Sequence, residues 1–172
     1  MKDFGPLPTR QGGNSKARIR LWLRLLRVSR AIEWEIRERL RVESGTTLPR
    51  FDVLAALSRH PNGLRMSELS SVLHVSNGNV TGIVERLAAD GLVLRVPVES
   101  DRRATMVSLT EAGRDEFFKL AELHERWVND LLSTINPDEA EVLWNLLAQL
   151  PAAKGGPPAT PCNAEPRYNE MR

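Results

Sequence analysis

The sequence predicts a mostly α-helical fold with one small β-hairpin, and three observations lead to this class. Apolar residues recur every three or four positions in six stretches between residues 16 and 150, the spacing of a helix face. Two short stretches are joined by a tight turn at residues 73–76. Two β-prone runs then flank residues 97–104. The sequence therefore predicts a winged helix-turn-helix at residues 48–110, within six helices and a two- to three-stranded hairpin sheet.

Length, charge and cysteine content limit the class of protein. A chain of 172 residues, 41% of them hydrophobic, is long enough to bury one core. The net charge is only +2, yet the first fifty residues carry twelve basic and five acidic side chains, which makes this end basic. The single cysteine, Cys162, excludes an intrachain disulfide framework. No apolar run reaches about 18 residues and the N-terminus lacks a signal-peptide pattern, so we expect a cytoplasmic protein with no membrane partner.

The N-terminal region is expected to be a basic arm followed by a long helix. Residues 1–15, rich in Gly, Pro and polar residues, are interpreted as a disordered arm. Residues 16–47 are assigned to an N-terminal dimerisation helix, because about 28 helical residues span about 42 Å, more than a small domain needs. Its apolar stripe consists of Leu21, Leu25, Val28, Ile32, Ile36 and Leu40.

Two short helices follow. Pro49 lies in the first turn of the first, and the breakers at residues 60–63 end it. The second runs from Met66 to about His74, and Arg65 stands at its N-cap, where serine or threonine is usual. The expected inward residues of the two helices are Phe51, Val53, Leu54, Leu57, Leu69, Val72 and Leu73.

The fourth helix and the hairpin complete the predicted winged domain. Ser76 is a good N-cap, and Gly91 fits a left-handed residue after the helix end near Ala89. The inward positions are Val80, Ile83, Val84, Leu87 and Ala88. The expected strands are residues 92–96 and 105–109.

Residues 111–150 are expected to form C-terminal dimerisation helices. Thr110 caps a helix that runs to about Thr134, and Asn136 followed by Pro137 begins the last helix, which Pro151 ends. Residues 151–172 are interpreted as a disordered tail.

The outward face of the helix after Ser76 is the first candidate site. Glycine inside a helix costs about 1 kcal/mol relative to alanine, so two glycines four residues apart require a reason. One alternative is close packing against a neighbouring helix, and the other is close approach of the backbone to DNA, with short polar side chains at base edges. We favour DNA, because the core face is already accounted for. The candidate contacts are Ser76, Asn77, Gly78, Asn79, Thr81, Gly82 and Arg86.

The hairpin tip is the second candidate site. Paired arginines on a loop are often only solvated, but Arg102 and Arg103 follow the helix-turn-helix at the distance of a wing. An arginine there can enter a narrow minor groove, and Asp101 can orient one guanidinium or serve only as a turn residue.

These motifs resemble the MarR family of bacterial transcriptional regulators. The resemblance is carried by SNGNVTGIVERLAADGLV from Ser76, by DRR at residues 101–103 and by SLTEAGR at residues 108–114, and it covers about residues 16–150. It implies a homodimer formed by the first and last helices and a pseudo-palindromic double-stranded DNA operator. It further implies that the helix after Ser76 contacts the major groove and that Arg102 and Arg103 contact the minor groove.

The resemblance also implies regulation by a ligand. Many members are repressors released by a small aromatic compound, and the segment TTLPRFDVLAAL is similar to members that control aromatic-acid catabolism. The effector is expected to be an aromatic acid or its CoA thioester. Arg18, Trp22, Arg50 and Phe51 are the candidate pocket, and the alternative is that the aromatic residues are core and the arginines solvated.

Other function classes fit less well. No phosphate loop, nucleophile elbow or metal-spaced pair is present, so we expect no enzyme, no cofactor and no metal. Two alternatives stay open: a winged helix used only for protein–protein contact, and a DNA-binding regulator that needs no ligand. Salt dependence separates the first from a DNA binder, because counterion release weakens DNA binding steeply as salt rises.

Overall fold

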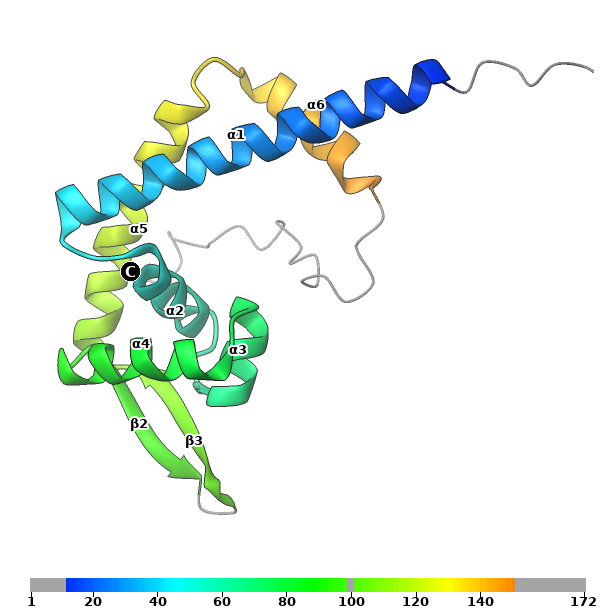
Figure 1. Ribbon diagram of the computed structural model, residues 1–172. Helices are drawn as coiled ribbons and strands as arrows, with labels where there is room; N and C mark the ends of the chain where they lie inside the picture. The colour runs from blue at the N-terminus through cyan, green and yellow to red at the C-terminus, as the bar shows by residue number, and fades with distance from the viewer. Residues whose placement is uncertain (1–11, 99–100, 151–172) are drawn as a thin grey trace, which may run out of the picture. The chain divides into compact units, whose positions relative to one another are not determined.

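The computed structural model describes residues 12–98 and 101–150 and contains within them six helices and three strands (Figure 1). The chain divides into two compact units between Gly45 and Thr46. The elements are α1 (Gly12–Ser44), α2 (Leu48–Ser58), β1 (Leu64–Arg65), α3 (Met66–Leu73), α4 (Asn77–Ala89), β2 (Val93–Val98), β3 (Asp101–Leu109), α5 (Glu111–Leu131) and α6 (Pro137–Ala148). The predicted fold class is confirmed, whereas the interpretations of residues 1–11 and 151–172 lie outside the described residues.

The first unit is the single long helix α1, which begins at Gly12 and therefore includes residues that the sequence assigned to an arm. Its C-terminal half is stabilised by pairs one turn apart, such as Glu33 with Arg37 at 2.6 Å and Glu38 with Arg41 at 2.5 Å. Only the C-terminal end of the expected stripe is buried, at Ile36 and Leu40. The other apolar positions on α1 include seven exposed side chains: Ile19, Leu21, Trp22, Leu23, Val28, Trp34 and Val42.

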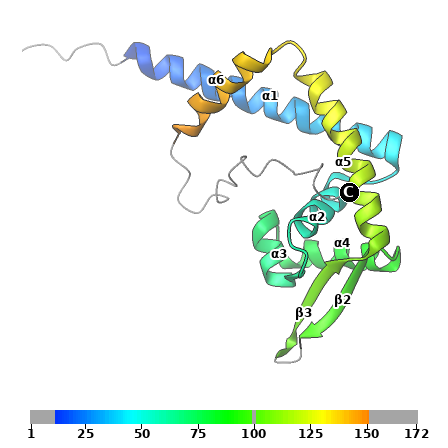
Figure 2. The same ribbon diagram turned by 180° about the vertical axis from the view of Figure 1, so that it is seen from behind.

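The core of the second unit lies among α2, α3, α4, α5 and the sheet, and Figure 2 shows how these elements are arranged. The predicted inward positions of α2 are all buried. In α3, Leu69 is buried and Leu73 is half-buried, but Val72 is 43% exposed, so the prediction that Val72 points inward is wrong. An eight-residue helix buries only a narrow stripe, which here contains Leu69 and Ser70.

The sheet is antiparallel, with strand order β1-β3-β2, and β1 adds Leu64 opposite Val107. The hairpin is longer than expected, because β2 continues to Val98 and β3 begins at Asp101. Pro97 pairs with Thr105 but the next residue, Val98, pairs with Asp101. This irregularity places Arg102 and Arg103 in an excess segment of β3, so the loop predicted at residues 97–104 is mostly strand.

Two helices follow the sheet. Thr110 caps α5, and the Gly113 amide donates to its hydroxyl at 2.9 Å. The helix ends at Leu131, three residues before the expected boundary. Asn136 and Glu139 form a capping box at the start of α6, with bonds of 2.9 and 3.0 Å. No residue of α6 is buried, although the helix is largely apolar.

Candidate nucleic-acid interface

The turn between α3 and α4 is fixed by short-range hydrogen bonds. His74 adopts a left-handed conformation with φ of 53°, and the Val75 amide donates to the Ser70 carbonyl at 3.2 Å. The Ser70 hydroxyl also donates to the side-chain oxygen of Asn77, which joins the two helices directly. Ser76 occupies the N-cap of α4 as predicted, but its side chain makes no capping hydrogen bond. The Ser70–Asn77 hydrogen bond therefore adds to the packing of buried Leu69, Val80 and Val84 in holding the helix-turn-helix together.

The two faces of α4 differ in burial. Val80, Val84 and Leu87 are 0% exposed, whereas Asn79 and Arg86 lie on the exposed surface. A Cβ added at either helix glycine would meet nothing within 4 Å, so no described neighbour requires a glycine there. Close packing within this chain therefore does not explain the two glycines, which are Gly78 and Gly82.

Two of the predicted contact residues have structural bonds of their own. The Thr81 hydroxyl donates to the carbonyl of Asn77 at 2.8 Å, one turn back along the helix. The side-chain oxygen of Asn77 accepts from Ser70. These bonds fix the orientation of both side chains, whereas no hydrogen bond of the Asn79 or Arg86 side chain is found among the described residues, and both residues are exposed.

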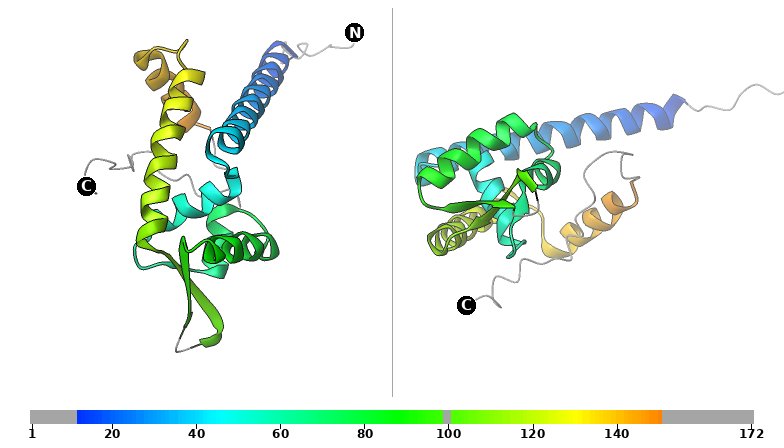
Figure 3. Two further views of the ribbon diagram at one scale, coloured as in Figure 1. Left: turned by 90° about the vertical axis from the view of Figure 1, so that its left-hand side faces the viewer. Right: turned by 90° about the horizontal axis from the view of Figure 1, so that it is seen from below.

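The wing projects beyond α4 in the left view of Figure 3. Arg95 of β2 lies 3.7 Å from Glu85 of α4, an ion pair that sequence reasoning missed because its partners are on different elements. The backbone of Asp101, Arg102 and Arg103 belongs to β3, but their side chains lie outside the described residues. The role assigned to them stays a prediction.

The end of α4 is joined to the start of α5. The Thr110 hydroxyl donates to the carbonyls of Gly91 and Leu92 at 2.8 and 3.1 Å. The backbone of Gly113 packs so closely against the Leu92 carbonyl that a Cβ would overlap it. The predicted left-handed Gly91 is confirmed, with φ of 73°. Thr110 and Gly113 of the SLTEAGR motif thus have a structural role. The sequence predicted the cap at Thr110 but not the close packing of Gly113.

The predicted effector residues are divided between the two units. Arg18 and Trp22 belong to α1, and Trp22 is 60% exposed. Arg50 pairs with Asp90 at 2.5 Å and so ties α2 to the end of α4. Phe51 is buried. Contacts within the second unit account for Arg50 and Phe51 without a ligand.

The surroundings of Phe51 form an aromatic cluster in the second unit. Its ring stacks on His124 at 4.9 Å and on Phe117 at 6.0 Å. Burial lowers the pKa of His124, because the charged imidazolium loses solvation there. The neutral, stacked ring is therefore the favoured state of His124.

Residues 12–98 and 101–150 contain neither a metal-binding cluster nor a membrane-spanning helix. No group of three histidine, cysteine or acidic residues in these ranges is placed to hold a metal ion. No helix in the same ranges is long and apolar enough to cross a membrane.

Comparison with known proteins identifies the family. A sequence model described as the MarR family matches residues 44–104. The transcriptional activatory protein BadR of Rhodopseudomonas palustris is 41% identical over 80 residues, or 45% of this chain and 46% of BadR. The regulator PecS of Dickeya dadantii is 31% identical over 102 residues, 58% of this chain and 61% of PecS. The chain thus spans about half to three-fifths of the length of these curated relatives.

Solved structures match over more of their length. A MarR family transcriptional regulator from Silicibacter pomeroyi is 33% identical, with a TM-score of 0.68 over 80% of this chain and 95% of that one. A mutant MarR from Escherichia coli complexed with operator DNA is 27% identical, with a TM-score of 0.67 over 77% and 95%. These names describe transcription regulators and not enzymes, in agreement with the sequence prediction. The chain belongs to the MarR family of winged-helix transcriptional regulators.

Proposed function

We propose that the chain is a DNA-binding transcriptional regulator that uses the exposed face of α4 to read a pseudo-palindromic operator. The observation that carries this proposal is the contrast between the two faces of α4. One face is closed by Val80, Val84 and Leu87, and the other is polar, exposed and open at two glycines. A helix of this kind fits the major groove, where short polar side chains reach base edges.

Dimerisation is the second part of the proposal. Helix α6 leaves five apolar side chains exposed, at 44–58% of each residue: Val142, Leu143, Trp144, Leu146 and Leu147. Such a face on a terminal helix is stabilised when a second copy covers it. A second copy would cover the exposed apolar residues of α1 for the same reason. A two-fold pair of α4 helices would then read half-sites about 34 Å apart.

The sign of regulation and the effector complete the proposal. We expect a repressor that a small aromatic acid or its CoA thioester releases from DNA, as the family resemblance implies. The relative BadR is named a transcriptional activatory protein, so activation is the competing sign. A reporter fused to the promoter of the chain's own gene, with and without the regulator, distinguishes the two signs.

DNA binding is tested by fluorescence anisotropy on the region upstream of the chain's own gene. Affinity should fall steeply between about 50 and 200 mM salt through counterion release. Arg86→Ala should weaken binding by about 1–3 kcal/mol, whereas Arg126→Ala, on α5, should not. Flat salt dependence, or equal affinity of both variants, would favour a module for protein–protein contact.

A further inference from the structure

We propose that a row of basic side chains on the N-terminal half of α1 binds the phosphate backbone of duplex DNA without regard to base sequence. The row, named here the basic stripe, consists of Lys16, Arg20, Arg24, Arg27 and Arg30. This contact is additional to the reading of an operator by α4. The proposal rests on the proposed function only in taking DNA as the available polyanion.

The five basic residues lie on one side of α1. Successive members are three or four residues apart, so at 3.6 residues per turn they fall within about 120° of the helix circumference. Leu23 is the other residue of this arc between residues 16 and 30. All five basic residues are exposed, and the row extends for about 21 Å along the helix axis. A linear partner with regularly spaced negative charges matches this geometry.

No acidic side chain of α1 compensates the charge of the basic stripe. Residues 16–32 contain no aspartate or glutamate, and the first turn of α1 has no acidic residue. Within the described residues, none of the five side chains takes part in an ion pair or a side-chain hydrogen bond. Like charges three or four residues apart repel one another, and cations near a helix N-terminus oppose the helix dipole. A bound polyanion would relieve both effects.

The C-terminal half of the same helix has the opposite arrangement. Arg37 pairs with Glu33 at 2.6 Å and Arg41 with Glu38 at 2.5 Å, and a third pair of this kind lies in the same half. The arginines are thus neutralised in one half of α1 and left unpaired in the other. A general excess of arginine in the chain does not explain this difference.

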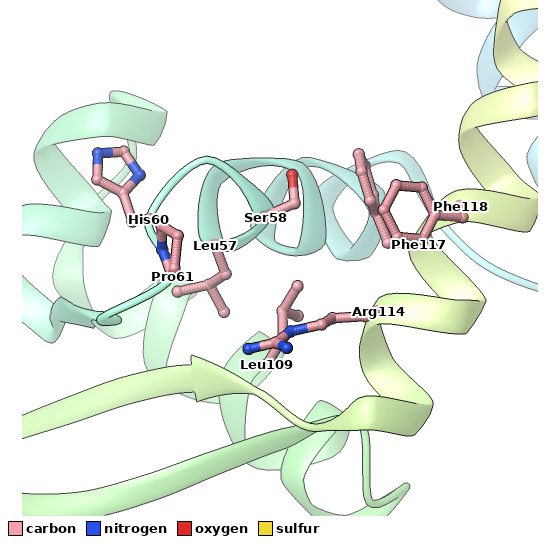
Figure 4. Close-up of a pocket in the computed structure, with 8 residues that line it drawn as sticks. All are labelled: Leu57, Ser58, His60, Pro61, Leu109, Arg114, Phe117 and Phe118. Atoms are coloured by element: carbon pink, nitrogen blue, oxygen red, sulfur yellow. The ribbon is translucent and has the colours of Figure 1, made fainter. Parts of the chain in front are cut away.

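A single unpaired arginine in the second unit has a different setting. Arg114 of α5 borders a cavity of about 280 Å³, and its guanidinium extends past Leu109 toward Leu57 (Figure 4). Its methylene groups can pack on these apolar walls while the guanidinium remains hydrated. One isolated cation of this kind needs no anionic partner. The basic stripe differs because five cations repeat along one line.

The composition and position of the basic stripe favour DNA over a membrane or a second copy. Four of its members are arginines, whose guanidinium groups bind phosphate oxygens through two hydrogen bonds. A row of about 21 Å runs along about six base pairs of duplex DNA. A bilayer would have to receive the apolar stripe, which lies on the opposite side of α1 and is buried at Ile36 and Leu40. The proposed dimer would also cover that opposite side and leave the basic stripe outward.

Long-range attraction to DNA then comes mainly from α1. Residues 51–110, which include the wing, carry six basic and six acidic side chains and are neutral overall. Residues 16–32 carry six basic side chains and no acidic one. An uncompensated row of this kind raises the local concentration of DNA and the rate of encounter before α4 meets its operator.

The test is fluorescence anisotropy of the full chain on a scrambled duplex of about 30 base pairs, at about 50 to 200 mM salt. Arg20→Gln with Arg24→Gln should lower affinity at least about tenfold at the lowest salt. The slope of log affinity against log salt should fall by about two, because each lost phosphate contact removes about one released counterion.

Matched controls separate the basic stripe from net charge and from packing. Arg37→Gln with Arg41→Gln removes the same charge from paired positions of the same helix and should keep the slope. Arg20→Lys with Arg24→Lys should also keep it, since charge alone would not rescue a purely structural role of the arginines. Arg27→Gln with Arg30→Gln should repeat the loss, with circular dichroism confirming that each protein is helical.

Four results would overturn the proposal. They are an unchanged slope in both stripe variants, and an equal change in the paired-arginine control. The third is a loss of self-association in sedimentation velocity that accounts for the weaker binding, which would assign the basic stripe to a second copy. The fourth is stripe-dependent binding to phosphatidylserine vesicles with an unchanged DNA slope, which would assign it to a membrane.

The region upstream of the chain's own gene separates this proposal from the proposed function. The stripe variants should weaken binding to that region and to the scrambled duplex by the same factor, whereas Arg86→Ala should reduce the preference between them. Absence of any preference for the upstream region would contradict the proposed function and leave the result on the scrambled duplex intact.

Discussion

The backbone of Gly113 in α5 lies directly against the carbonyl group of Leu92, at the point where α4 has just ended. A side chain at position 113 would overlap backbone atoms that cannot move aside without shifting the start of β2. This contact joins the segment after α4 to the long helix that follows the wing.

Gly113→Ala should therefore destabilise the fold by about 3 kcal/mol, the upper range for an overpacked site. Chemical denaturation gives the free energy of unfolding. Ala112→Gly, next to it on the exposed surface, is the control and should cost only about 1 kcal/mol. Equal losses in the two variants would mean that the close approach is relieved at little cost.

Gly82→Ala should have the opposite effect on stability. Because a Cβ there meets nothing within 4 Å, the variant should gain about 0.5–1 kcal/mol from helix propensity. If the bare backbone approaches DNA, operator affinity should fall by about tenfold, or about 1.4 kcal/mol, at the same time. Denaturation and anisotropy measure the two quantities. Unchanged affinity would remove this turn of α4 from the interface, and Glu125→Ala on α5 serves as the neutral control.

His124 should make stability depend on pH. Its folded-state pKa lies below the ordinary value near 6.5, so the unfolded chain binds the proton more readily. Stability should therefore be complete above about pH 6.5 and decline as pH falls from there toward the folded-state pKa. His124→Phe keeps an aromatic ring against Phe51 without titrating. Denaturation from pH 5 to 8 should show a smaller loss in the variant, and identical slopes would contradict this role.

Leu147→Glu should weaken self-association. Leu147 lies on the exposed apolar face of α6, 44% exposed, so a charge there costs the isolated chain little but is buried unpaired in a dimer. Sedimentation velocity should show a shift from dimer toward monomer with unchanged helical content. Glu141→Gln on the same helix should remain dimeric, and a dimer of unchanged stability in the leucine variant would exclude α6 from the interface.

Local sequence signals predicted most of the helices. Contacts between residues distant in sequence explain most of the differences between the prediction and the structure. The caps at Thr110 and Asn136 and the left-handed Gly91 were predictable because each depends on its immediate neighbours. Arg65 is an unusual residue type at an N-cap, but its amide donates to the Glu68 carboxylate at 2.7 Å, so the third residue of the helix supplies the cap. Because Glu68 lies only three residues after Arg65, this cap also depends on a local sequence pattern.

In the candidate sites too, some features follow from local sequence and others depend on packing between elements. Periodicity separated the buried face of α4 from its exposed face, because both follow from the same helical repeat. The ion pair between Arg50 and Asp90 and the cavity beside Arg114 depend on packing between elements and have no local signature. The extra length of β3 around Arg102 was also missed, since an irregular register is set by the partner strand.

The absence of a side-chain capping bond at the N-terminus of α4 would affect the enthalpy and entropy of operator binding. The first N–H groups of a helix have no acceptor within it, and the Ser76 side chain does not supply one. A phosphate bound there would act as the missing cap and would order the first turn in the same step. Part of the enthalpy of operator binding, and part of its entropic cost, would then belong to completion of the helix and not to contacts with bases.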